Sequence, residues 1–133
     1  AQLLSTAHHL AGSDPQILAN IYRPTHINHP SAIWVRSNKA NYTWLFHLFV
    51  ALLDEYTFRY GKSHKSQQLI PYLSRPPAIL SEETFFAPPL VMEEKYIIGD
   101  AVTSYRNYYR QGKRHLHQWT KREIPSWLNT EHA

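Results

Sequence analysis

The sequence predicts a mainly α, single-domain helical fold around a central helix at about residues 38–60, with a long irregular proline-rich loop at about 74–99. Apolar side chains recur at helical spacing through the central helix. Three of the four glycines each follow a stretch with a helical pattern, which is where a left-handed residue ends a helix. The length of 133 residues fits one domain with a sizeable core, so residues 1–133 are expected to form a single domain.

The first expected helix covers residues 1–11 and ends at Gly12. It starts without a capping residue, although the first four amides of a helix need partners. We therefore expect the natural chain to begin upstream, with an N-terminal segment that is missing here. Residues 20–30 contain two prolines and are expected to form an ordered loop. Pro30 fits the first turn of a short helix that runs to about Arg36.

The central helix can be capped by Ser37 or Asn38, and Gly61 is suited to end it. Its apolar stripe is wide, which predicts that this helix lies at the centre of the fold. The stripe consists of Tyr42, Leu45, Phe46, Phe49, Leu52, Leu53, Tyr56 and Tyr60.

Beyond the central helix, Ser63 can cap a short helix that reaches about Leu73. The loop at 74–99 is expected to be extended, with at most one short strand, and loops of this length in compact domains are often functional. The remaining expected elements are a helix at 101–111 capped by Asp100, a further helix to about Trp119 and a short turn at 124–128.

The composition excludes several function classes. The chain has no cysteine, so it has no disulfide, zinc–thiolate site or cysteine nucleophile. This usage suits a reducing compartment, and we expect a cytoplasmic protein. The longest apolar run, near residues 44–53, is far shorter than the ~20 residues of a membrane span, so no membrane partner is expected. No Gly-x-Ser-x-Gly element supports a serine nucleophile.

The net charge of +4 is distributed unevenly. Residues 1–66 carry six Lys/Arg against three Asp/Glu, residues 67–100 carry two against five, and residues 101–133 carry six against two. Two basic segments therefore flank an acidic middle, which favours an anionic partner such as nucleic acid or a phosphorylated ligand. Ordinary solubilising charge is the alternative.

The first candidate site is a carboxylate–arginine pair on the central helix. Glu55 and Arg59 are four residues apart, roughly on one face with Asn41, and can pair. A carboxylate held by an arginine inside a cleft is a candidate general base. The alternative is an ordinary helix ion pair, which contributes a few tenths of a kcal/mol to stability.

The second candidate is the loop at 23–30, where His26 and His29 lie three residues apart. Two histidines can begin a metal site, with His64, or else His8 or His9, as a third ligand, and such a site would suit a metal-dependent hydrolase. Because the third ligand is not firm, we assign no metal and no other cofactor from the sequence. His29 precedes Pro30 and can equally cap the short helix.

The third candidate is the basic turn at 62–66. Lys62, His64 and Lys65 lie beside an expected helix start and can contact a phosphate. The turn lacks the glycine pattern and the preceding strand of a nucleotide-binding P-loop, so that type of site is rejected. A solvated basic turn is the alternative.

The fourth candidate is the segment at 105–110, where Tyr105, Arg106 and Arg110 interleave aromatic and basic side chains. This pattern suits a nucleic-acid backbone with stacked bases. The alternative is that the tyrosines belong to the core and the arginines are solvated. Exposed aromatic residues at 105–109 or 119–127 could also form the interface of a homo-oligomer.

Several motifs together resemble a known family. They are His29-Pro30-x-x-Ile33-Trp34-x-Arg36, Asn41-Tyr42-x-Trp44-Leu45, the segment from Glu55 to Ser66, Tyr105-Arg106-x-Tyr108-Tyr109 and the tail from Trp119 to Trp127. With them, most of the chain looks like a family of small uncharacterised proteins of phages and marine microbes. The family's chain begins earlier, with a Cys-Asp-Lys-His segment on a helix, which agrees with the expected missing start.

The layout also resembles that of pyrimidine-dimer DNA glycosylases, which are small, basic, helical phage proteins with an aromatic-rich C-terminal tail. Those enzymes use an N-terminal amine as nucleophile together with a helix glutamate. The amine has no match in this chain, and Glu55 is not a secure counterpart of the glutamate. The resemblance therefore implies only a direction, which is DNA processing.

We predict a nucleic-acid- or nucleotide-processing protein, with DNA repair or base modification as the process that the resemblance implies. The alternatives are a non-catalytic nucleic-acid binding module and a metal-dependent hydrolase that uses His26 and His29, so enzyme activity stays open. The expected catalytic residues are Glu55, His29 and His64. The expected ligand- and phosphate-binding residues are Arg23, His26, Arg36, Asn41, Arg59, Lys62, Lys65, Tyr105, Arg106 and Arg110.

Overall fold

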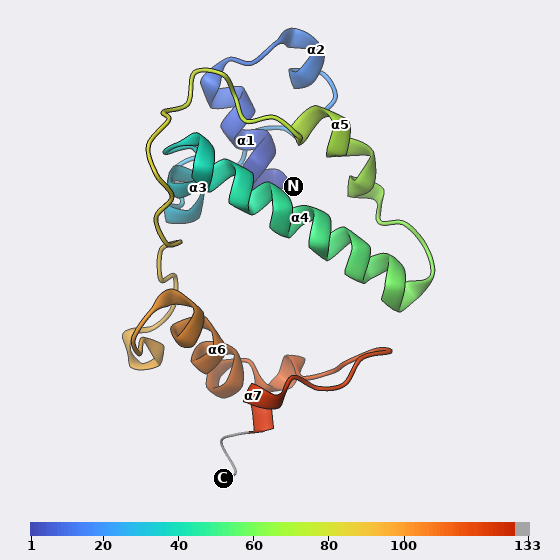
Figure 1. The fold of residues 1–133 in the computed structure, drawn as a ribbon, viewed down its shortest axis with the longest axis vertical. Coiled ribbons are helices and arrows are strands. Elements are labelled where there is room, and N and C mark those ends of the chain that lie inside the picture. The colour runs from blue at the N-terminus through green and yellow to red at the C-terminus, as the bar shows by residue number, and fades with distance from the viewer. Residues whose placement is uncertain (130–133) are drawn as a thin grey trace. The chain divides into compact units, whose positions relative to one another are not determined.

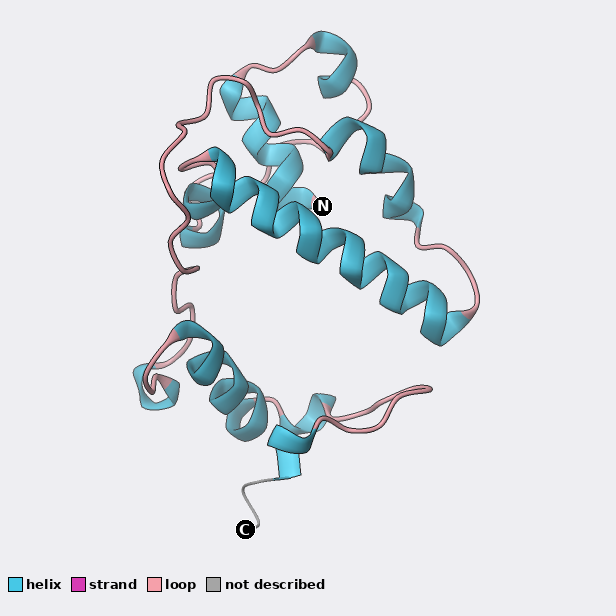
Figure 2. Cartoon of the chain, viewed as in Figure 1, coloured by secondary structure: helices cyan, strands magenta, loops and turns pink. Residues whose placement is uncertain are grey.

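In the computed structural model, which describes residues 1–129, the chain is built of helices and loops (Figures 1 and 2). None of these residues lies in a strand, so the predicted mainly α fold is confirmed and the proline-rich loop contains no strand. The chain divides into two compact units, unit 1 from Ala1 to Phe86 and unit 2 from Ala87 onwards, and we describe each by itself. The expected single domain stays a prediction.

Unit 1 contains one long helix and several short ones, and their ends follow the sequence signals. The Asn38 side chain caps the long helix by accepting a hydrogen bond from the Asn41 N–H at 2.7 Å. Gly61 ends that helix in the left-handed conformation, at φ 68°. The elements are α1 (Gln2–Ala11), α2 (Pro15–Leu18), α3 (Pro30–Val35), α4 (Lys39–Tyr60), the 3₁₀ helix η1 (Lys65–Leu69) and α5 (Ile70–Leu73).

The core of unit 1 lies where α4 contacts α1, α3 and η1. Burial of apolar side chains there contributes most of the stabilising free energy, at roughly 25 cal/mol per Å² of apolar surface. No helix among residues 1–129 is both long and apolar enough to cross a membrane. The core side chains are Leu4, Ala7, Trp34, Val35, Tyr42, Phe49, Leu53, Leu69 and Leu73.

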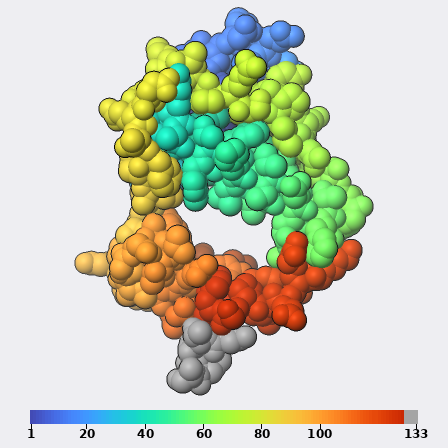
Figure 3. Space-filling model, viewed as in Figure 1, coloured from blue at the N-terminus to red at the C-terminus, as the bar shows by residue number. Residues whose placement is uncertain are grey.

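The buried face of α4 is narrower than predicted. Phe49 and Leu53 are buried, but Leu52 is 60% exposed and Tyr60 is 54% exposed. Leu52 lies about 100° around the helix from Leu53, at the wall of an open depression and not in the core. Tyr60 occupies the last turn, where the helix ends. In Figure 3 the outer side of α4 (teal to green) accordingly forms part of the visible surface of unit 1.

A buried polar network crosses the core of unit 1. The Tyr42 hydroxyl donates to the Leu73 carbonyl at 2.7 Å, so it accepts from His8 Nε2–H, also at 2.7 Å. The other His8 nitrogen, Nδ1, therefore accepts from the Ser13 hydroxyl at 2.8 Å. His8 is 2% exposed. Burial lowers the pKa of its imidazole to about 4 and raises that of the Tyr42 hydroxyl, so both groups are neutral at neutral pH.

Unit 2 is organised around α6 (Ala101–Gly112), with the 3₁₀ turns η2 (Glu94–Tyr96) and η3 (Arg114–Leu116) and the final α7 (Ser126–Asn129). Asp100 caps α6 as predicted, because its carboxylate accepts a hydrogen bond from the Thr103 N–H at 2.8 Å. The same hydrogen bond lowers the pKa of the Asp100 carboxyl.

The further helix expected to reach Trp119 is wrong, because η3 already ends at Leu116. Side chains bind the backbone carbonyls at this point. The Tyr109 hydroxyl donates to the Leu116 carbonyl at 3.1 Å, and His117 Nε2 lies 2.9 Å from the Tyr109 carbonyl. The His117 and Tyr109 rings also stack, with centroids 5.0 Å apart. These contacts fold the chain back onto α6 and stop the helix.

Candidate functional site

The segment after α4 forms an ordered polar corner of unit 1. His64, and not the predicted Ser63, caps η1, because its Nδ1 accepts a hydrogen bond from the Ser66 N–H at 3.0 Å. The His64 ring packs edge-to-face against Tyr56 of α4, with centroids 4.9 Å apart. Ser66 is buried, and its Oγ lies 2.7 Å from the Tyr22 hydroxyl. The imidazole is therefore held both by its own turn and by α4.

Two adjoining depressions in the surface of unit 1 include His64 in their walls. The first has a volume of about 270 Å³ and is lined mainly by apolar side chains of α4. The second has a volume of about 490 Å³ and a more polar wall, to which Tyr22 and Lys65 contribute. They adjoin because Ala1, His64 and Ser66 line both of them. Of the predicted site residues, His64 and Lys65 are brought together here.

The predicted carboxylate–arginine pair forms. Arg59 Nε donates to Glu55 Oε2 at 2.7 Å, and the two side chains are 23% and 28% exposed. Neither residue lines the depressions around His64. Glu55 is therefore part of a half-buried helix ion pair, outside the walls that contain His64.

The histidines of the loop at 23–30 have separate places. His29 caps α3, because its Nδ1 accepts a hydrogen bond from the Ser31 N–H at 3.0 Å. His26 is exposed and has a positive φ of 49°. Among residues 1–129 no group of three His, Asp or Glu side chains is arranged to hold a metal ion. His29 therefore has the capping contact that the sequence offered as an alternative to metal binding.

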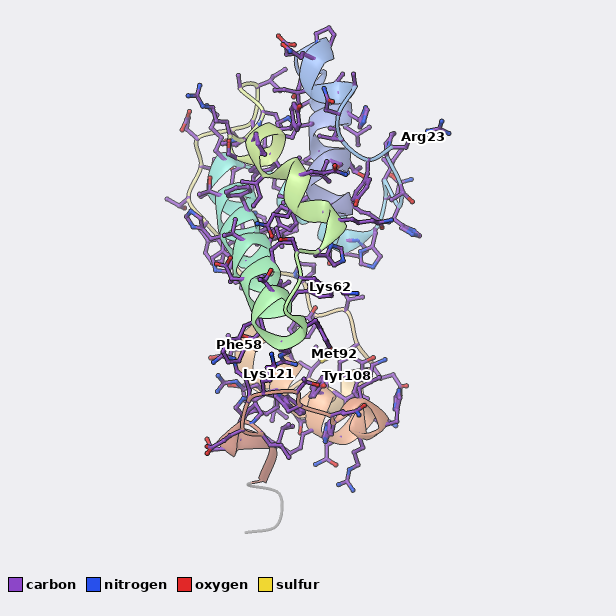
Figure 4. The ribbon with its side chains drawn as sticks, turned by 90° about the vertical axis from the view of Figure 1, so that its right-hand side faces the viewer. Arg23, Phe58, Lys62, Met92, Tyr108 and Lys121 are labelled. Atoms are coloured by element: carbon purple, nitrogen blue, oxygen red, sulfur yellow. The ribbon has the colours of Figure 1, made fainter. Side chains whose placement is uncertain are left out.

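Three further predicted phosphate-binding residues of unit 1 do not line the depressions around His64. They are Arg23, Arg36 and Lys62. Arg36 donates from Nη1 to the Ile27 carbonyl at 2.7 Å and so fastens the loop to the end of α3. Arg23 is exposed, and Figure 4 shows its side chain extending away from unit 1. Lys62 is exposed in the loop after α4 and lines neither depression (Figure 4).

Asn41 is buried at the start of α4, where it joins three segments of unit 1. Its Nδ2 donates to the Trp34 carbonyl at 2.9 Å, and its Oδ1 accepts from the Phe86 N–H at 3.2 Å. A buried amide with these contacts holds the loop after residue 80 against α3 and α4. Both polar atoms of the Asn41 side-chain amide are therefore hydrogen-bonded to the protein backbone.

The predicted site residues of unit 2 are Tyr105, Arg106 and Arg110. All three contact other residues of unit 2. The Tyr105 hydroxyl donates to the Pro89 carbonyl at 2.5 Å and accepts from the Val91 N–H at 3.1 Å. The Arg106 guanidinium lies 5.4 Å from the centre of the Trp127 ring, and Arg110 Nε donates to the Trp127 carbonyl at 3.1 Å. Both arginines therefore help to hold the C-terminal tail on α6.

Residues 101–129 combine this aromatic packing with a one-sided charge. They contain six Lys/Arg and a single acidic residue, Glu123. Arg106, Arg114, Lys121 and Arg122 are exposed. Lys113 lies over the ring of Tyr108, 5.3 Å from its centre, and Figure 4 shows Tyr108 on α6.

Three residues at the corner around His64 were not predicted as site residues. Tyr56 was assigned to the apolar stripe of α4 and noted as a neighbour of the Glu55–Arg59 pair, but it was not named as a site residue. Ser66 was noted within the basic turn but has its hydroxyl directed to Tyr22. Tyr22 carries no local signal at all, because it comes from a loop that is 44 residues away in the sequence. Only the folded chain brings these hydroxyl groups next to the imidazole.

Comparison with protein-family models, with curated proteins and with solved structures finds no match. The resemblances to the phage and marine-microbe family and to the DNA glycosylases stay predictions.

Proposed function

We propose that the protein binds nucleic acid through the part of unit 2 from Ala101 to Asn129, which we call the basic–aromatic segment. The observation that carries the proposal is its charge, six Lys/Arg against one acidic residue. Several of these cations are exposed around α6 and the tail. A phosphate backbone is the polyanion that such a surface attracts, since each phosphate contact releases condensed counterions.

The basic–aromatic segment also contains aromatic rings that contact one another. Tyr109 contacts Trp119 and Trp127 edge-to-face, with centroids 6.1 Å apart in each pair. These rings are partly exposed and lie next to guanidinium groups, a composition that suits a phosphate backbone with stacked bases. The combination favours single-stranded nucleic acid, in which the base faces are accessible.

Salt dependence tests this proposal directly. Neutralising two exposed cations, Arg106→Gln with Lys121→Gln, should weaken binding of a single-stranded oligonucleotide about tenfold at low salt. It should also reduce the slope of log K against log salt concentration by about 1.4, at roughly 0.7 per phosphate contact. Fluorescence anisotropy at several salt concentrations measures both.

The matched control is Lys95→Gln, in the same unit but outside the segment. Lys95 pairs with Glu93 at 3.4 Å, in an acidic stretch, so its loss should leave both affinity and slope unchanged. Absence of binding, or binding that does not depend on salt, would contradict the proposal. An equal effect of the control variant would show a general charge effect and no binding surface.

A second candidate is an enzyme that processes nucleic acid or nucleotides, including repair or modification of bases. It is supported by His64, an imidazole held beside two depressions by Tyr56 and Ser66. An imidazole is suited to general acid–base catalysis near neutral pH. The test compares turnover of undamaged, ultraviolet-irradiated and base-modified oligonucleotides by the wild type and by His64→Asn, which keeps a capping acceptor. Identical turnover by the wild type and by His64→Asn would show that His64 takes no part in the reaction.

A further inference from the structure

The two depressions around His64 differ in chemistry although they share a wall. The walls of the first include Phe49, Leu53 and Tyr56, which present an apolar surface. The walls of the second include Lys65, which carries an ammonium group, and Tyr22, whose hydroxyl is hydrogen-bonded to Ser66. A ligand that occupies both must therefore have an apolar part and an anionic part. Their volumes, about 270 and about 490 Å³, together lie in the usual range for small-ligand sites.

The apolar depression suits a flat ring. Tyr56 and His64 stand nearly perpendicular to each other, at 86°, so they form two sides of a corner. A planar heterocycle placed in such a corner can contact one ring with its face and the other with its edge. Stacking of a base on an aromatic side chain is worth about 1–3 kcal/mol by alanine substitution.

His64, which lines both depressions, carries a hydrogen-bond donor. Because Nδ1 of His64 accepts the Ser66 N–H, the proton of the neutral ring is on Nε2. An N–H donor at this position can bind a ring nitrogen, a carbonyl oxygen or a phosphate oxygen. Neither depression has an Asp or Glu in its described walls, so nothing there repels an anion.

We propose that the two depressions together bind one nucleotide, with its base in the apolar depression beside Tyr56 and its phosphate beside Lys65. The inference rests on the proposed function, because the ligand that it places in unit 1 is a nucleotide, the building block of a nucleic acid. The same chemistry has two sources, a free nucleotide and a nucleotide within a single strand. Both present a flat base joined to a phosphate.

Three small probes separate the parts of this site. Adenosine 5′-monophosphate should bind at least about tenfold more tightly than adenosine or inorganic phosphate alone, because only the nucleotide fills both depressions. Titrations followed by NMR, with the His64 ring signals as reporter, measure the three dissociation constants. If inorganic phosphate binds as tightly as the nucleotide, or if no probe shifts the His64 signals at ~10 mM, the inference is wrong.

Variants then test each depression. Tyr56→Leu keeps an apolar side chain but removes the ring, and Lys65→Glu reverses the exposed charge; each should weaken nucleotide binding about tenfold. Arg75→Glu is the matched control, since Arg75 is exposed in the same unit and lines neither depression. It should change the affinity less than twofold. Equal losses in Lys65→Glu and Arg75→Glu would overturn the site. Circular dichroism confirms that each variant is folded.

The two proposals fail separately. Arg106→Gln with Lys121→Gln should weaken oligonucleotide binding and leave the binding of adenosine 5′-monophosphate unchanged. If oligonucleotide binding survives but the nucleotide never binds, the site around His64 is wrong and the proposed function stands. If Tyr56→Leu weakens binding of both the mononucleotide and a single strand, the site takes strand nucleotides. If it weakens only the mononucleotide, the source is free nucleotide.

Discussion

Unit 1 and unit 2 are stabilised by different interactions. Unit 1 buries a cluster of apolar side chains together with the His8–Tyr42 network. Unit 2, over the residues whose burial is described, buries only Ser104 and Leu128. Its helix is held instead by caps, ring contacts and cations over rings. The apolar core is therefore concentrated in unit 1, whereas the densest positive charge lies in residues 101–129 of unit 2, with six Lys/Arg against one acidic residue.

This difference has a physical reason. Charged side chains are costly to bury without a partner, so a segment rich in Lys and Arg can form only a small apolar core. Rings and guanidinium groups stack at the surface and keep the charges in water. The segment that we propose for nucleic-acid binding therefore depends on weak contacts, each worth about 0.5–1 kcal/mol at an exposed site.

The largest expected effect comes from a cavity in unit 1. Leu73 is 0% exposed, whereas Leu116 of unit 2 is 50% exposed. Leu73→Ala should lower the free energy of unfolding by about 2–5 kcal/mol, and Leu116→Ala by less than ~0.5 kcal/mol. Urea unfolding followed by circular dichroism measures both. Similar losses in the two variants would mean that the units do not differ as described.

The second effect is a dependence of unit 1 stability on pH. The His8 pKa is about 4 in the folded chain and 6.5 in its ordinary state, so the unfolded state takes up the proton first as the pH falls. Stability should be constant above about pH 6.5 and should fall between pH 6.5 and 4, by at most about 3 kcal/mol from this group.

The matched variant for this prediction is His8→Gln, which keeps a donor but cannot ionise. Its unfolding free energy should vary less between pH 6.5 and 4 than that of the wild type, because the carboxylates are the same in both proteins. A titration of the His8 ring by NMR gives its pKa directly. Equal slopes for wild type and variant would show that His8 is not buried as a neutral ring.

A smaller effect is expected inside unit 2. Tyr105→Phe removes the hydroxyl that bridges the Pro89 carbonyl and the Val91 N–H. The loss should be about 1 kcal/mol, since water can replace part of these contacts. Hydrogen exchange should then show faster exchange at α6 amides, with α1 and α4 amides of unit 1 unchanged as an internal control. Faster exchange in both units would indicate that the bridge stabilises the whole chain.

Local signals predicted most of the helix ends. Gly112 is an exception, because it lies within α6 without a positive φ, and Lys113 follows it as the C-cap. Gly12, Gly61 and Asp100 act at the positions where their conformational preference or hydrogen bonding applies. Pro30 opens α3 with His29 as its cap. Such signals depend on neighbours within three or four residues, so they are readable from the sequence. The cap of η1 was placed one residue early because serine and histidine side chains both offer an acceptor there.

Of the corner around His64, the sequence predicted His64 and Lys65, which belong to one turn, but not the contact from Tyr22. Tyr22 reaches Ser66 over 44 residues, so no local signal announces it. The same limit made α4 look more buried than it is. Leu52 fits the apolar stripe, but only the placement of the neighbouring helices decides which side of the stripe is covered. Packing, which is non-local, buries Leu53 in the core and leaves Leu52 60% exposed.

The smallest effect tests whether the ion pair on α4 is structural. Glu55→Gln weakens the contact with Arg59, which at this exposure should cost only a few tenths of a kcal/mol. If binding belongs to the basic–aromatic segment and the nucleotide site lies around His64, the variant should bind both an oligonucleotide and adenosine 5′-monophosphate within about twofold of the wild type. A loss of turnover with binding and stability intact would instead assign Glu55 to the chemistry, because a structural ion pair has no reason to affect turnover alone. The turnover of Glu55→Gln, measured together with that of His64→Asn, distinguishes a carboxylate that only stabilises α4 from one that acts on a substrate.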